Sequence, residues 1–413
     1  MSRSGSERHI PGPSTGAAIG RRLLLRRNAA LWDSHKEIFS VIEASLRPCA
    51  DVGDRFNWLQ GGNHLFKKLL TVAAAGLVGA AAFGAAGDAE AQKVRWKMQS
   101  AFGSKLSIIG EVAARYEDIV KDMSAGDLNI KFYEPGALVP TLQGFDAVEA
   151  GSVDAMWGTA GYHTGKYPAL SFFTAVPFGP RAGELLAWMG YGGGDELYNE
   201  LYAKHDLIGL HCAAIAPETS GWFRSKLNSI DDLKGKKMRF FGLGAKVMTK
   251  LGVSTQLLAG ADIYPALERG VIDATEFSMP SIDLDLGFYQ IAKFNYFPGW
   301  HQQSSIGELL MKKSAFEGLS GQHQAIIRHA CDASITWSFV RSEAFQFEAM
   351  LKLKEKGVES VRWSDDDLAK LSKAWDEVVA EENAADPIFA KFHASYQAFR
   401  DKYAIWKEHG YLD

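Results

Sequence analysis

One nine-residue pattern occurs twice in this chain, as Ala147-Val-Glu-Ala-Gly-Ser-Val-Asp-Ala155 and as Ala266-Leu-Glu-Arg-Gly-Val-Ile-Asp-Ala274. Each copy predicts the end of a helix, a glycine that stops it, and a short apolar strand. Such a corner is common, so coincidence stays open. Each copy nevertheless occupies the same place in a series of alternating strands and helices. The repetition therefore favours two lobes of similar construction.

The two series have the same order of elements. We expect the first series over strand 94–99, helix 106–121, strand 129–133, helix 141–150 and strand 153–157, and the second over strand 237–241, helix 244–251, strand 253–256, helix 262–269 and strand 272–276. A βαβαβ order implies a parallel sheet with right-handed crossovers, hence an α/β fold. Ligands bind beyond the C-terminal ends of such strands, which here hold Trp157 and Glu276-Phe277.

The rest of the chain connects and covers these lobes. Runs 207–213 and 221–224 resemble strands that cross or link the lobes, and Ser229 is expected to cap a short turn. The last third is helical, with a long helix, straight or kinked, over 321–355, a strand over 358–363 and a helix over 365–382. We assign 92–213 mainly to lobe I, 214–300 mainly to lobe II, and 301–385 to returning strands and helices that pack on both.

The final helix, 386–413, begins at Asp386-Pro387 and carries aromatic residues three and four positions apart. Such a stripe is usually part of a core. Its other interpretation is a contact with a partner subunit. The stripe comprises Phe389, Phe392, Tyr396, Phe399, Tyr403 and Trp406.

Residues 66–91 have the pattern of a signal peptide. Lys67 and Lys68 precede an apolar run over 69–86, and Ala89-Glu-Ala91 fits the cleavage rule, so Gln92 would begin the mature protein. The alternative is a single membrane anchor, since the run has about the minimum spanning length. We interpret residues 1–65 as a disordered, over-extended N-terminus with the true start near Leu65, although Arg21-Arg22 resembles a twin-arginine signal.

Composition excludes several classes of protein. Apolar residues make up 47% of the 413 residues and charged residues 23%, which indicates a globular chain. The net charge is −4, and residues 92–413 alone carry 34 basic and 41 acidic residues, which argues against nucleic-acid binding. Only Cys212 and Cys331 remain after cleavage; a disulfide is open, and we expect two buried free thiols.

No familiar catalytic motif is present in the sequence. It has no GxSxG, HExxH, P-loop or CxxC, and its histidines lack zinc-ligand spacing. The segment Gly242-Leu-Gly-Ala-Lys-Val247 half resembles a dinucleotide fingerprint; it is better interpreted as a glycine turn whose helix can face an anion. A binding protein is therefore favoured over an enzyme.

Arg239 is the leading candidate for ligand binding. It lies in the predicted strand 237–241 that leads into that glycine turn, and an arginine near the cleft end of a strand suits bidentate recognition of a carboxylate. The alternative is a structural ion pair. Glu218 and Glu276 are the next candidates, because two acids near one arginine balance its charge or bind a hard cation through oxygen. Their alternative role is as solvated acids.

A Pro-Gly turn in Pro298-Gly-Trp-His-Gln-Gln303 follows an aromatic run and is typical of a pocket wall or an aromatic core corner. It would present Trp300, His301 and Gln302. His301 is either a ligand contact or a histidine satisfied by hydrogen bonds within the core.

Several motifs resemble the solute-binding proteins of tripartite ATP-independent periplasmic (TRAP) transporters, DctP type. They are Ser229-Ile-Asp-Asp-Leu-Lys-Gly-Lys-Lys-Met-Arg239, Ile263-Tyr-Pro-Ala-Leu-Glu-Arg-Gly-Val-Ile-Asp-Ala274 and Gly221-Trp-Phe-Arg224. Leu286-Gly-Phe-Tyr289, Ala292-Lys-Phe294 and Phe297-Pro-Gly-Trp300 resemble the subgroup that binds 2-oxo acids. The resemblance covers about Val94 to Trp406.

The resemblance implies a two-lobed, periplasmic-binding-protein-like fold that closes on an organic acid and delivers it to TRAP membrane subunits. Arg239 would grip the carboxylate, and a sodium or calcium ion would be held by Glu218, the Phe277 carbonyl and Gln302. The subgroup usually has Gln, Trp and Glu at these three positions, so carboxylate and amide are exchanged here. His301 replaces a subgroup tryptophan, which puts the identity of the acid in doubt.

The resulting prediction is a periplasmic solute-binding protein for a small 2-oxo or 2-hydroxy monocarboxylate, without catalysis or an organic cofactor. Glu276, Trp157, Tyr162, Trp222 and His301 would shape the pocket. The subgroup also forms homodimers by exchanging the C-terminal helix. Two rivals stay open: an accessory of a membrane sensor, and a secreted α/β enzyme.

Overall fold

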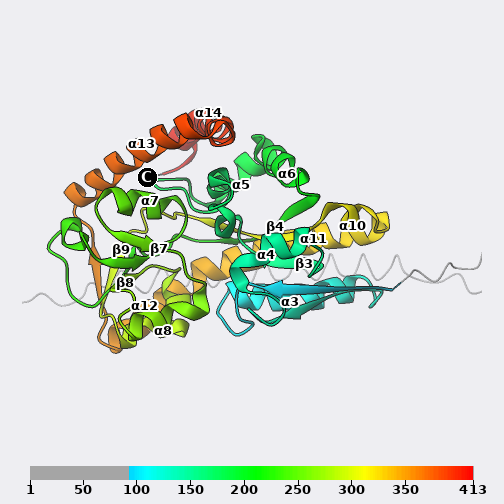
Figure 1. The fold of residues 1–413 in the computed structure, drawn as a ribbon, viewed down its shortest axis with the longest axis horizontal. Helices are drawn as coiled ribbons and strands as arrows, with labels where there is room; N and C mark the ends of the chain where they lie inside the picture. The colour runs from blue at the N-terminus through cyan, green and yellow to red at the C-terminus, as the bar shows by residue number, and fades with distance from the viewer. Residues whose placement is uncertain (1–92, 413) are drawn as a thin grey trace, which may run out of the picture. The chain divides into compact units, whose positions relative to one another are not determined.

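Two β-sheets with their covering helices make up the described part of the protein, residues 93–412 of a computed structural model (Figure 1). The predicted signal peptide and the segment before it lie outside the described residues. Each sheet is the centre of one lobe, and the chain crosses from one lobe to the other more than once.

The first sheet has the order β2-β1-β3-β10-β4. Its first three strands run parallel, as the βαβαβ order predicts, and β10 then pairs antiparallel with both β3 and β4. The strands are β1 (Val94–Ser100), β2 (Leu128–Tyr133), β3 (Ala155–Gly158), β4 (Leu207–Ile215) and β10 (Ser305–Lys312).

The second sheet has the order β11-β9-β5-β8-β6-β7. Strands β7, β6 and β8 are parallel and correspond in order to β2, β1 and β3 of the first sheet. Strand β5 pairs antiparallel with β8, as β10 pairs with β3 in the first sheet. The strands are β5 (Gly221–Phe223), β6 (Lys237–Arg239), β7 (Ser254–Gln256), β8 (Ala274–Thr275), β9 (Phe294–Phe297) and β11 (Glu359–Arg362).

The repeated sequence pattern performs the same structural task in both sheets. The Asp154 carboxylate accepts the backbone N–H of Lys97 at 2.8 Å, and the Asp273 carboxylate accepts that of Lys237 at 2.8 Å. The next residue of each copy, Ala155 or Ala274, starts the parallel pairing with the central strand. The aspartate thus satisfies the last N–H before the ladder begins, which explains why the pattern occurs twice.

The helices fall close to the predicted ranges. They are α3 (Ile109–Met123), α4 (Gly144–Glu149), α5 (Ala182–Tyr191), α6 (Gly194–Ala203), α7 (Gly242–Lys250), α8 (Gly260–Glu268), α9 (Pro280–Leu286), α10 (Lys313–Glu317), α11 (Gly321–Ala344), α12 (Gln346–Glu355), α13 (Asp365–Ala385) and α14 (Pro387–Gly410). The sequence analysis missed α5, α6, α9, α10 and the strands β9 and β10. The strands 153–157 and 272–276 are shorter than predicted.

The predicted kink in the helix over 321–355 is confirmed, because α11 and α12 meet at Phe345. Helix α11 packs on β4 and α3 of the first lobe, and α12 packs on α9 of the second. Gln346 connects the two parts: its side-chain amide donates to the Ser342 carbonyl and the Ser281 hydroxyl and accepts the Ser281 N–H. The break therefore lies where the chain passes from one lobe to the other.

The last two helices also serve both lobes. Helix α13 packs on α7 of the second lobe, and α14 packs on α5 and α6 of the first (Figure 1). Phe389, Phe392 and Tyr396 of α14 are buried, whereas Trp406 is 58% exposed. The aromatic stripe is therefore core in its first half and surface in its last turns.

The prediction of free thiols is wrong: Cys212 and Cys331 form a disulfide. It joins β4 to α11 across the interior of the first lobe. Nothing in the spacing of the two cysteines indicated this, because 119 residues separate them and only the packing of α11 on β4 brings them together.

Among residues 93–412, no helix has the length and apolar character that crossing a bilayer requires. The run that raised the question of a membrane anchor, residues 69–86, lies outside this range.

Candidate functional site

A small cavity of about 50 Å³ lies between the two sheets and takes its walls from both lobes. Its walls are mostly apolar and aromatic, with a few polar groups, as is typical of small-molecule sites. The polar groups on its walls belong to Arg239, Glu218, Gln302, Thr159, Tyr162, Ser278 and Ser305. Apolar walls come chiefly from Phe102, Ile109, Trp157, Ile215, Phe241, Phe277 and Ile306.

The cavity lies at the C-terminal ends of the parallel strands, as expected. Phe102, Thr159, Phe241 and Phe277 follow the last residues of β1, β3, β6 and β8 by no more than two positions and line the cavity. The sequence analysis applied this rule to Trp157, Glu276 and Phe277 only, and of these Trp157 and Phe277 line the cavity. Applied to every parallel strand, the rule would also have found Phe102, Thr159 and Phe241.

Arg239 is buried and is held in place on one side only. Its Nη1 donates to the carboxylate and to the backbone carbonyl of Glu276, both at 2.8 Å, and its Nε donates to the Leu258 carbonyl at 3.2 Å. An arginine has five N–H donors. The two on Nη2 have no acceptor among the described residues, and the side chain lines the cavity. The ion-pair alternative is therefore present in the structure, and the free Nη2 leaves carboxylate recognition by Arg239 as a prediction.

Glu276 fixes Arg239 and stays ionised. One carboxylate oxygen accepts from Arg239 and from the backbone N–H of Phe241 at 2.5 Å. Burial raises the pKa of Glu276, but attraction to Arg239, the neighbouring His301 imidazole and a hydrogen bond from the Phe241 N–H outweigh burial and hold the pKa below its usual value. Glu276 itself does not line the cavity; it supports the arginine from behind.

Glu218 and Gln302 present unpaired oxygens at the cavity. Glu218 Oε1 accepts from the Ser278 hydroxyl at 3.1 Å, whereas Glu218 Oε2 and Gln302 Oε1 are buried without a partner. Burial, followed by the charges of Glu276 and Asp283, raises the pKa of Glu218 well above its usual value. Carboxylate and amide oxygens are suitable ligands for sodium or calcium, so the residues present fit such an ion.

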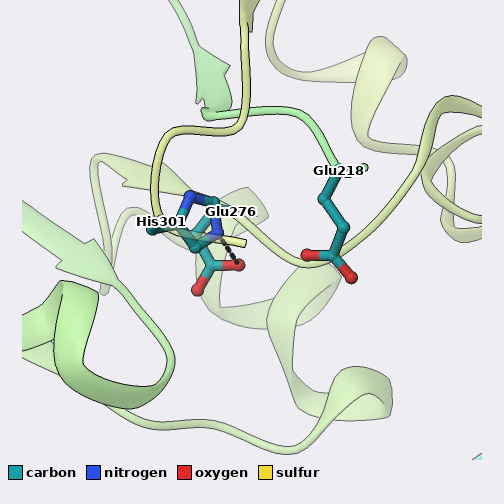
Figure 2. A group of neighbouring side chains, drawn as sticks. All are labelled: Glu218, Glu276 and His301. Atoms are coloured by element: carbon teal, nitrogen blue, oxygen red, sulfur yellow. Dashed lines mark ion pairs between the residues drawn. The ribbon is translucent and has the colours of Figure 1, made fainter. Parts of the chain in front are cut away.

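His301 and Trp222 lie behind the cavity rather than on its walls. His301 is fully buried, with its Nε2 at 3.5 Å from the second carboxylate oxygen of Glu276 (Figure 2). The Trp222 indole N–H donates to Asp283 at 2.7 Å. Burial raises the pKa of that aspartate to about 7. The ring centroids of Trp300 and Phe240 lie 5.8 Å apart in the core of the second lobe. The Pro-Gly turn over 298–303 therefore forms part of an aromatic core corner.

Trp157 and Tyr162 line the cavity from the first lobe, in line with their position after β3. The Tyr162 ring meets Phe241 of the second lobe edge-on at 5.5 Å. Gly161 permits this approach, because a Cβ there would lie 2.0 Å from the Phe241 ring. Burial raises the pKa of Tyr162 to about 12, so its hydroxyl keeps its proton and can donate.

The sequence analysis did not predict the cavity-lining residues of the antiparallel strands β4 and β10. Ile215 ends β4, while Ser305 and Ile306 begin β10, and these strands reach the cavity only because β10 inserts between β3 and β4. No local pattern in the sequence specifies that insertion.

The fold and the cavity together define a two-lobed solute-binding protein. The chain belongs to the DctP family of bacterial extracellular solute-binding proteins, family 7, whose model matches residues 100–385. It is therefore a periplasmic binding component of the TRAP transporter type, as the resemblance implied. This family binds solutes and is not a family of enzymes.

Three relatives illustrate the family. A monocarboxylate 2-oxoacid-binding periplasmic protein of Nostoc sp. (strain PCC 7120) is 35% identical over 76% of this chain and 86% of its own length. A TRAP solute-binding protein of Bordetella bronchiseptica RB50 has a TM-score of 0.75 and 31% identity over 77% of this chain and 95% of that one. It is a mixed-occupancy dimer with copurified calcium and picolinate. A protein of Pseudoalteromonas atlantica T6c, with sodium and pyruvate bound, has a TM-score of 0.74 and 30% identity over 77% and 97%.

Proposed function

We propose that this protein captures a small monocarboxylate, a 2-oxo or 2-hydroxy acid, for import through TRAP membrane subunits. The observation that carries the proposal is the donor edge of Arg239. Its Nη2 can donate a charge-assisted hydrogen bond to a carboxylate while Nη1 keeps its bonds to Glu276. The relatives that bind 2-oxoacids and pyruvate support this class of ligand.

The size and lining of the cavity favour a small ligand. A cavity of about 50 Å³ holds a few non-hydrogen atoms, and aromatic rings from both lobes enclose it. Thr159 Oγ1 is buried without a partner on the first-lobe wall, where it can bond a keto or hydroxyl oxygen. Trp157 and Tyr162 complete that wall, while Trp222 and His301 act from behind it.

A cation belongs to the proposed complex for reasons of charge. Arg239 balances the ionised Glu276, so a bound acid and an ionised Glu218 would together add two uncompensated negative charges. Burying that excess without compensation is costly. We propose that a sodium or calcium ion, held by Glu218 Oε2, Gln302 Oε1 and the Phe277 carbonyl, supplies the balance. Sodium and calcium accompany the acids in two relatives.

A thermal-unfolding screen of the purified protein against small carboxylates, with sodium, calcium or neither, tests the proposal. A ligand at 100 times its Kd stabilises the folded state by about 2.7 kcal/mol. We expect a shift for 2-oxo acids that requires the cation. A shift that ignores the cation would remove the ion from the proposal, and no shift with any acid would favour the sensor or enzyme alternatives.

We further propose that a signal peptide is cleaved after Ala91.

We also propose that the mature protein is a homodimer whose interface is formed by α14. At the end of this helix, Ile405, Trp406 and Tyr411 are each more than half exposed. An exposed apolar surface of this kind is typical of a protein–protein contact. Replacing Ile405 and Trp406 by Ser should convert a dimer to a monomer in analytical ultracentrifugation with little change in unfolding. An unchanged sedimentation coefficient would contradict this interface.

A further inference from the structure

Three buried side chains near the cavity bring metal-ligating atoms close together. Glu218, Glu276 and His301 each offer one such atom, and these atoms all lie within 4.8 Å of one another (Figure 2). Glu218 comes from the segment after β4, Glu276 from the end of β8 and His301 from the turn after β9. All three side chains are at least 97% buried.

Each of the three side chains has a buried polar atom without a hydrogen-bond partner in the described part of the chain. These atoms are Glu218 Oε2, Glu276 Oε2 and both ring nitrogens of His301. The distance from His301 Nε2 to Glu276 Oε2 is 3.5 Å, which is too long for a good hydrogen bond. A buried polar atom left unpaired costs about 1–3 kcal/mol, and unpaired ligand atoms on three adjacent side chains indicate a missing positive partner.

We propose that Glu218, Glu276 and His301 bind a zinc-type divalent cation. Sodium and calcium prefer all-oxygen sites, whereas an imidazole nitrogen beside carboxylates suits zinc and related transition ions. The inference uses Glu218, which also belongs to the proposed sodium or calcium site. It therefore rests on the proposed function for its biological meaning, and it specifies which kind of cation this region binds.

The charge of the cluster favours a divalent ion. Arg239 contributes one positive charge and Glu276 one negative charge, and Glu218, whose pKa is raised in the absence of a cation, contributes a second negative charge once a bound cation ionises it. A monocarboxylate ligand brings the total to −2, which a divalent ion neutralises and a sodium ion only halves. Arg239 occupies the other oxygen of Glu276, so the guanidinium and the metal do not compete for the same atom.

The packing around His301 holds the imidazole in place. Phe240 meets the ring edge-on at 4.9 Å. Gly244 leaves room behind it, because a Cβ there would lie 3.0 Å from His301 Cβ. The other ring nitrogen, Nδ1, has no partner among the described residues. Ligand histidines usually donate that N–H, and losing such support costs roughly 10–100-fold in metal affinity, so we expect moderate rather than very tight binding.

Calorimetric titration of chelator-treated protein with Zn²⁺ alone tests the site, without any organic acid present. We expect one zinc per chain, bound in the presence of excess sodium. Replacing His301 by Gln keeps a similar volume and should weaken zinc at least about tenfold. Cobalt(II) serves as a spectroscopic probe: its visible bands should appear in the wild type and change in His301→Gln.

The matched control is His163→Gln. His163 is also buried and faces a buried glutamate, Glu308, at 3.4 Å, but it is not part of the cluster. This variant should bind zinc as the wild type does. Thermal unfolding in metal-free buffer checks that both variants fold. Equal zinc affinity in His301→Gln and wild type, or the absence of wild-type binding, would overturn the proposal.

Calcium-dependent stabilisation of the wild-type protein by pyruvate, measured in zinc-free buffer, separates this inference from the proposed function, because the calcium ligands of the proposed function do not include the imidazole. Pyruvate binding without any zinc site would refute this inference alone. Zinc binding without any carboxylate binding would refute the proposed function and leave the metal site standing.

Discussion

At the scale of single residues, Arg239 combines an ion pair with the carboxylate-binding role that we propose for it. A buried ion pair needs its partner, and a ligand-binding group needs free donors. The guanidinium separates these needs geometrically, since Nη1 and Nε are bound to the protein while Nη2 is available. Lysine has a single donor centre and cannot make this division.

Replacing Arg239 by Ala should remove carboxylate binding and lower the free energy of unfolding by about 3–5 kcal/mol, because Glu276 is left buried and uncompensated. Adding Glu276→Gln to that variant should recover part of the stability but none of the binding. Denaturant unfolding and calorimetry measure the two effects separately. Micromolar affinity for an acid in either variant would contradict the role assigned to Arg239.

At the scale of elements, the repeated pattern shows how a short sequence specifies a strand start. The glycine ends the helix, an apolar residue enters the core, and the aspartate accepts the last free N–H of the neighbouring strand. The two copies lie in different lobes, yet both lead into the strand that pairs with the central one. Their agreement comes from a shared local geometry.

Replacing Asp154 or Asp273 by Ala should therefore lower stability by similar amounts, about 1 kcal/mol each, because each change removes one hydrogen bond to a strand N–H. Asp376→Ala is the control, since this exposed side chain on α13 makes no hydrogen bond among the described residues. Urea unfolding of the three variants measures the differences. A clear effect of one aspartate without the other would show that the two copies are not equivalent.

At the scale of the whole molecule, the lobes meet around the cavity and also at its edge. The backbone N–H of Ser107, just before α3 of the first lobe, donates to the Asp285 carboxylate on α9 of the second at 3.0 Å. Ile109, two residues further on, lines the cavity. A bond between the lobes at this point stabilises the closed arrangement, which is the one that encloses a ligand.

Asp285→Ala should weaken ligand binding without touching the cavity. Losing one hydrogen bond of the closed arrangement corresponds to about a twofold to tenfold rise in Kd. Because the open form does not need this bond, unfolding of the ligand-free protein should change less than the affinity. Asp376→Ala again serves as the control in calorimetry. An unchanged Kd would mean that this contact does not contribute to closure.

Local sequence patterns determined the elements that depend on neighbouring residues. The alternation of strands and helices, the cap at Ser229, the glycine stops and the position of Arg239 near a strand end all follow from interactions within a few residues. The parallel sheets also followed, because βαβ order restricts the possible connections.

Tertiary structure alone decided what depends on distant residues. The disulfide between Cys212 and Cys331, the insertion of β10 beside β3 and the grouping of Glu218, Glu276 and His301 each join segments far apart in the chain. The sequence around His301 does not indicate whether its side chain lines the cavity or lies behind the cavity wall. Burial and orientation depend on the packing of the whole lobe, and that packing is a collective property which no short segment contains.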